Sequence, residues 1–112
     1  MNIGIYIYDD AEVLDFSGPF EVFSTANRLV ESDAFNVFLI SEKNTPINAR
    51  GGFEVKAKYN IANHPALDVL IVAGGVHYAQ LENSAVIAWI AKQNSKGTFE
   101  QVTHAPGAQR SS

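Results

Sequence analysis

Two features of this 112-residue chain could form part of a catalytic or binding site: one carboxylate and one pair of adjacent glycines. The carboxylate is Asp15, which directly precedes a predicted helix and could carry a proton. Gly74 and Gly75 follow an apolar run, and adjacent glycines allow backbone N–H groups to point into a cleft. Each feature also has a structural interpretation, because an aspartate can cap a helix and a Gly-Gly pair can form a tight turn.

The glycines end the segment LDVLIVAGGV, residues 67–76, around which the rest of the chain is organised. Leu70, Ile71 and Val72 are apolar in succession, which is typical of a parallel strand covered on both faces. Ligands bind beyond the carboxyl ends of the strands in open parallel sheets. In a doubly wound sheet the first strand can end at the same crevice, so we expect Asp15 to lie near the glycines.

The amino-terminal third predicts a strand-helix-strand unit. IGIYIY, residues 3–8, predicts the first strand, and FNVFLI, residues 35–40, predicts the second. Between them we expect a helix that runs to about residue 31, with Ser17 as its cap, Pro19 in its first turn and Glu21 near its positive end. Its expected apolar face consists of Phe20, Phe23, Ala26 and Val30, with Val22 and Leu29 beside them.

The rest of the chain predicts a hairpin, a strand, a helix and a strand. Residues 44–59 alternate around the turn Arg50-Gly51-Gly52, and we interpret Arg50 as solvated rather than as an anion contact. Residues 60–66 form a connector, residues 84–95 a helix capped by Ser84, and residues 98–103 a strand. The alternation predicts a single α/β domain over residues 1–112, a three-layer sandwich with a mostly parallel sheet.

The composition excludes several classes of function. Hydrophobic residues make up 46% of the sequence, but no apolar run approaches the length of a membrane span. We therefore expect a cytoplasmic protein that does not bind membranes. The net charge of -4 argues against nucleic-acid binding. The absence of cysteine excludes disulfides, thiolate ligands and a thiol nucleophile. His64, His77 and His104 lack metal-ligand spacing, and we expect no metal and no cofactor.

Three motifs together resemble the N-terminal half of the ThiJ/PfpI family in the class I glutamine amidotransferase-like superfamily. They are VLDFSGPFEVF (13–23), ARGGFEV (49–55) and DVLIVAGGV (68–76). Within the family they are most similar to isonitrile hydratases and to the amidase-like N-terminal domains of AraC-type transcriptional regulators. The resemblance implies a flavodoxin-like sandwich, usually a homodimer, that binds a small-molecule ligand or substrate.

The resemblance also implies roles for individual residues. The family has a cysteine at a strained turn after the strand that matches residues 98–103. Asp15 would orient or exchange a proton with that cysteine or its substrate, while amides around Gly74, Gly75 and Val76 would stabilise an oxyanion. In this chain Ala105 stands where the cysteine is expected. The resemblance therefore implies either an enzyme of amidase or isonitrile hydratase type in a truncated, inactive form, or the ligand-sensing domain of a regulator.

The last residues, HAPGAQRSS, lose the apolar periodicity, so we expect the helix and strands that follow the cysteine in the family to be missing. A shift of reading frame near His104 and a naturally divergent terminus are the two interpretations of this change. Because the last predicted strand would lack its covering helix, we also expect exposed apolar surface and self-association.

Overall fold

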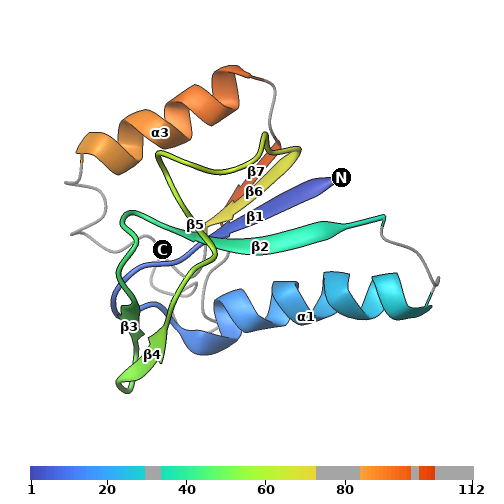
Figure 1. The fold of residues 1–112 in the computed structure, drawn as a ribbon, viewed down its shortest axis with the longest axis horizontal. Coiled ribbons are helices and arrows are strands. Elements are labelled where there is room, and N and C mark those ends of the chain that lie inside the picture. Colours follow the sequence, from blue (N-terminus) through green and yellow to red (C-terminus); the bar gives the residue numbers. More distant parts are fainter. Residues whose placement is uncertain (30–33, 73–83, 97–98, 103–112) are drawn as a thin grey trace, which may run out of the picture.

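The computed structural model describes residues 1–29, 34–72, 84–96 and 99–102. In this part of the chain a five-stranded sheet has the order β5-β2-β1-β6-β7, and all its pairings are parallel (Figure 1). The strands are β1 (Asn2–Tyr6), β2 (Asn36–Ser41), β5 (Tyr59–Asn60), β6 (Val69–Val72) and β7 (Phe99–Val102). The predicted central strand is confirmed, because β6 lies between β1 and β7 and its Leu70 to Val72 are buried.

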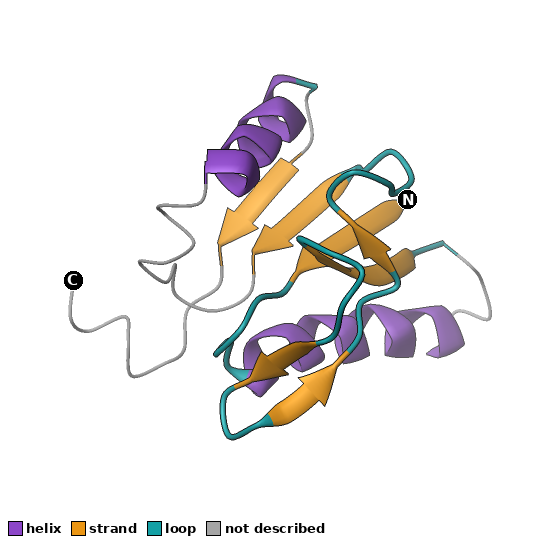
Figure 2. Ribbon diagram, turned by 60° about the vertical axis from the view of Figure 1, so that its left-hand side comes forward, coloured by secondary structure: helices purple, strands orange, loops and turns teal. Residues whose placement is uncertain are grey.

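Two helices cover opposite faces of the sheet, which confirms the three-layer, flavodoxin-like sandwich (Figures 1 and 2). They are α1 (Val13–Leu29) and α3 (Ser84–Ser95). From α3, Val86 and Trp89 are buried, and the Trp89 ring lies 5.6 Å from the ring of Tyr6 at the end of β1. None of the described helices is long and apolar enough to span a membrane.

Helix α1 differs from its prediction in start and orientation. It begins at Val13, so Ser17 is not its cap and Pro19 lies inside it. The start is earlier because Val13 packs against the core and Phe16 is buried in it. Burial of Phe16 thereby determines which face of α1 packs on the sheet. The prediction of the apolar face is wrong in part, because Val22 and Leu29 are 64% and 79% exposed.

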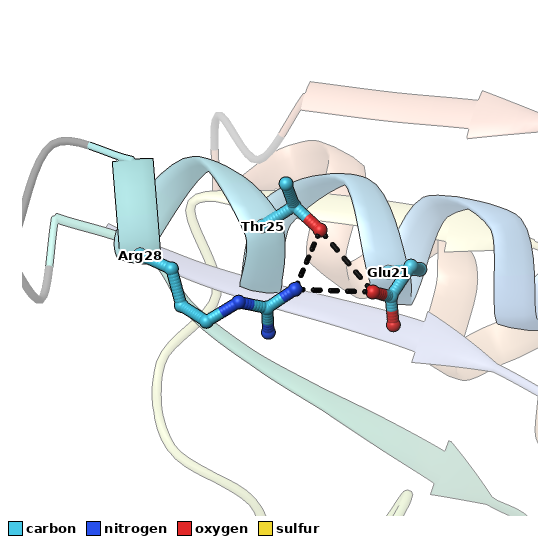
Figure 3. A network of polar contacts seen from close by, with 3 residues as sticks. All are labelled: Glu21, Thr25 and Arg28. Carbon is cyan, nitrogen blue, oxygen red and sulfur yellow. Dashed lines mark hydrogen bonds and ion pairs between the residues drawn. The ribbon is translucent and has the colours of Figure 1, made fainter.

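The outer face of α1 carries a polar network instead (Figure 3). Thr25 Oγ1 donates a hydrogen bond to Glu21 Oε1 at 3.2 Å, and Arg28 Nη2 donates to Thr25 Oγ1 at 3.0 Å. Arg28 Nη2 also lies 3.3 Å from Glu21 Oε1, with both side chains about two-thirds exposed. Glu21 therefore pairs with a cation in the middle of the helix rather than serving its positive end, and exposed pairs of this kind add little stability.

The predicted hairpin consists of β3 (Ile47–Ala49) and β4 (Phe53–Val55), which pair antiparallel. Gly51 and Gly52 have φ angles of 85° and 80°, a left-handed conformation that glycine adopts without steric cost. Ile47 and Ala49 are buried as the alternation predicts, but Phe53, next to the turn, is 55% exposed. The two-residue strand β5 falls at the end of the predicted hairpin segment and was too short for the pattern to indicate.

Gly4 in β1 is expected to tolerate no side chain. A Cβ atom there would lie 2.7 Å from Ile40 Cδ1 and 2.9 Å from Leu67 Cδ2, and both side chains are buried with little room to move. We expect Gly4→Ala to lower the free energy of unfolding by about 1–3 kcal/mol. Urea denaturation followed by tryptophan fluorescence measures this change.

Gly18→Ala is the matched control, because a Cβ at Gly18 in α1 would meet nothing within 4 Å. Alanine also favours a helix interior over glycine by roughly 0.5–1 kcal/mol, so this variant should be more stable than the parent. Equal effects of the two substitutions would show that the contacts around Gly4 do not limit packing.

Candidate functional site

The candidate site lies at the carboxyl edge of the sheet, where β1, β6 and β7 end level with one another. Tyr6 is in register with Val72, and Val72 is in register with Val102. The strand that follows β1 in sequence, β2, lies on one side of β1 in the sheet, whereas the later strands β6 and β7 lie on its other side. The ends of β1 and β6 therefore form the topological switch point at which open α/β sheets bind ligands.

A short turn after β1 positions Asp15 at this edge. The N–H of Ala11 donates to the carbonyl of Tyr8 at 3.1 Å, and Asp10 has a φ of 68°, which aspartate tolerates in tight turns. The N–H of Asp15 then donates to the carbonyl of Glu12 at 3.1 Å. As a result, Asp15 is half-buried in the first turn of α1.

The β3–β4 hairpin holds this turn in place through the backbone. The N–H of Asp10 donates to the Asn48 carbonyl at 2.8 Å, and the N–H of Arg50 donates to the Ala11 carbonyl at 2.9 Å. Arg50 Nη1 also lies 2.6 Å from Glu12 Oε1. Arg50 is exposed, in agreement with its interpretation as a solvated residue, and its contacts give it a structural role beside the site.

Tyr8 is the site residue that the sequence did not indicate. It is buried, and its pKa is raised, first by that burial and then by the negative charge of Asp15, while Arg50 acts in the opposite direction. The Tyr8 ring also stacks on the Tyr6 ring, with centroids 6.1 Å apart. Burial raises the pKa of Tyr6 as well, followed by the charge of Glu42. The site thus combines a carboxylate with two phenols that stay protonated at neutral pH.

These two tyrosines predict a loss of stability in alkali. Because folding raises both pKa values, the neutral phenols stabilise the fold fully below the unfolded-state pKa of about 10, and this contribution is lost as the pH rises above it. Urea denaturation between about pH 9 and about pH 11 should show a steep fall that is smaller in Tyr6→Phe. The same fall in both proteins would contradict this origin.

A pocket of about 210 Å³ opens beside this site, between the segments that follow β1 and β2. Its lining is largely polar and includes the residues Tyr6, Tyr8, Asp9, Glu42, Lys43 and Thr45. Carboxylates, phenols and an ammonium group can hydrogen-bond a small polar molecule from several sides. The pocket could therefore hold a small polar ligand next to Tyr6 and Tyr8.

The other predicted site residues lie outside the described part of the chain. Strand β6 ends at Val72, two positions before Gly74, so Gly74, Gly75 and Val76 are not described. The same holds for Ala105, which comes three positions after the end of β7, and for His77 and His104. The shared crevice between Asp15 and the glycines stays a prediction.

Comparison with known proteins connects this architecture to the family that the motifs resemble. No family model matches the chain. The uncharacterized protein in the cpoL 5' region of Streptomyces lividans is 34% identical over 74 residues, which are 66% of this chain and 51% of that protein.

Solved structures match most of the chain. An AraC family transcriptional regulator from Pseudomonas putida has a TM-score of 0.73 at 20% identity, covering 90% of this chain and 62% of the regulator. A ThiJ/PfpI family protein from Pseudomonas syringae has a TM-score of 0.77 at 16% identity, with 90% and 40% covered. Oxidized DJ-1 from Toxoplasma gondii has a TM-score of 0.69 at 17% identity, with 90% and 54% covered.

The chain thus spans between about two-fifths and three-fifths of the length of these proteins. At sequence identities below 25%, these structural similarities show a common fold but do not show a common activity. The chain therefore has the fold of ThiJ/PfpI and DJ-1 proteins, the family that its three sequence motifs resemble.

Proposed function

We propose that this chain forms the Asp15-bearing side of the active-site crevice in a ThiJ/PfpI-type protein of the amidase or isonitrile hydratase class. The observation that carries the proposal is the half-buried carboxylate in the first turn of α1, at the switch point between β1 and β6. The proposal is supported by the effect of the Asp15 charge, which together with burial raises the pKa of the buried Tyr8 phenol.

The chemistry of this class needs a nucleophile, a proton carrier and donors for a developing negative charge. Asp15 is the proposed proton carrier, and the amides around Gly74, Gly75 and Val76 are the proposed donors. The sequence contains no cysteine, so we propose that this polypeptide binds its small-molecule ligand but does not turn it over. Neither a metal nor a cofactor enters this proposal.

The variant Ala105→Cys tests this assignment, because residue 105 aligns with the cysteine of the family motif. We expect no product from the parent chain. The variant should add water to an isonitrile, R–N≡C, to give the formamide R–NH–CHO, or hydrolyse a simple amide, faster than the solution without protein. Turnover by the parent, or no gain in the variant, would contradict the proposal.

A ligand-sensing domain of a transcriptional regulator is the second candidate. It is favoured by the similarity to the AraC family regulator and by the polar pocket beside Tyr6 and Tyr8, which requires no thiol to bind a ligand. Thermal shift measurements with the same isonitriles and amides separate the two candidates. Binding by the parent chain, together with the absence of turnover in Ala105→Cys, supports the sensor.

A further inference from the structure

We propose that a second cavity, distant from Asp15, binds a small carboxylate with a short apolar body. This cavity of about 310 Å³ is lined by His64, Ala66, Leu67, Gln93 and Lys96. Residues 64–67 precede β6, and Gln93 lies in the last turns of α3. The cavity is therefore at the amino edge of the sheet, opposite the carboxyl edge that holds Asp15. It is called the amino-edge cavity below.

Gln93 provides the observation that points to a ligand. With Val86 and Trp89 it lies on the face of α3 that packs on the core, and it is only 3% exposed. Within the described residues the structure gives its side-chain amide no hydrogen-bond partner. Because Gln93 lines the cavity, its amide is open to a molecule there, and a ligand that hydrogen-bonds the amide can replace water. Gln93 can donate from its nitrogen and accept at its oxygen.

His64 forms a wall of the cavity but offers it no polar atom. Trp89 Nε1 donates a hydrogen bond to His64 Nε2 at 2.9 Å, so Nε2 carries no proton. The proton is then on Nδ1, which donates to the Pro65 carbonyl at 2.7 Å. Both ring nitrogens are occupied, and the neutral ring meets Trp89 edge to face at 5.5 Å. The polar chemistry of the cavity therefore comes from Gln93 and Lys96.

The charge of Lys96 decides the class of ligand. Among the described residues that line the cavity, Lys96 is the charged one and none is an aspartate or glutamate. A carboxylate ligand would accept from the Gln93 amide with one oxygen while its negative charge pairs with Lys96. Ala66, Leu67 and the His64 ring are apolar surfaces for a short hydrocarbon body. A volume of this size suits a molecule of a few heavy atoms.

Fluorescence of the parent chain with sodium butyrate as the probe tests the proposal. Trp89 is the single tryptophan in the sequence and contacts His64 in the cavity wall, so ligand binding should change its emission. We expect a saturable change with butyrate that sodium chloride at equal ionic strength does not produce. Lys96→Gln should weaken butyrate binding about two- to fivefold through loss of the charge pair.

Lys92→Gln is the matched control, because it removes the same charge from an exposed position on α3 that does not line the cavity. We expect its affinity for butyrate to equal that of the parent. Gln93→Leu, which keeps the helix face apolar, should abolish the saturable change while the chain remains folded. No saturable change in the parent, or equal weakening by Lys92→Gln and Lys96→Gln, would overturn the proposal.

Discussion

Replacing Asp15 by asparagine in the Ala105→Cys variant is expected to lower its turnover at least about hundredfold, because a positioned general acid or base contributes roughly a factor of 10² to 10⁴. Asparagine has almost the same shape as aspartate but cannot carry the proton. Asp15 is half-buried in the first turn of α1, so the substitution should change catalysis far more than stability. Steady-state rates of formamide formation measure the effect.

Glu12→Gln is the control for this experiment. It removes a carboxylate from the same turn, but Glu12 pairs with the exposed guanidinium of Arg50 and is not part of the proposed chemistry. We expect its turnover to stay close to that of Ala105→Cys. The pKa of Tyr8 provides an independent readout, because it should fall in Asp15→Asn when the negative charge beside it is removed. Unchanged turnover in Asp15→Asn would contradict the catalytic role.

The strands and the hairpin could be predicted because their sequence patterns are local. An unbroken apolar run such as Leu70 to Val72 is buried in any parallel sheet between helices, and a Gly-Gly pair next to alternating residues indicates a tight turn. The start of α1 could not be predicted in this way. Ser17 and Pro19 are local signals for a helix start, but burial of Phe16 against the sheet outweighs them.

The candidate site shows the same division. The position of Asp15 near the carboxyl edge could be predicted because Asp15 follows the first strand of a parallel sheet, whereas its position relative to the glycines stays a prediction. Tyr8 could not be recognised, since its importance depends on the charge of Asp15 and on burial by segments distant in sequence. His64 lies in the predicted connector, residues 60–66, and its contact with Trp89 joins residues 25 positions apart. No spacing rule connects them.

The strongest test of the fold is a pair of isoleucine-to-alanine substitutions. Ile5 is fully buried in β1, where it lies between Leu39 of β2 and Ile71 of β6. Ile5→Ala leaves a cavity that these neighbours, fixed in their strands, can fill only in part. We expect it to lower the free energy of unfolding by about 2–5 kcal/mol, a large share of the roughly 5–15 kcal/mol that stabilises a typical domain.

Ile87→Ala removes the same atoms from α3, where the side chain is 41% exposed, and should cost less than about 1 kcal/mol because little surface returns to water. Urea denaturation of both variants, followed by Trp89 fluorescence, gives the difference directly. A loss in Ile5→Ala as small as that in Ile87→Ala would mean that β1 is not the central packed strand. In that case the switch point, and the position of Asp15 beside it, would have no rigid support.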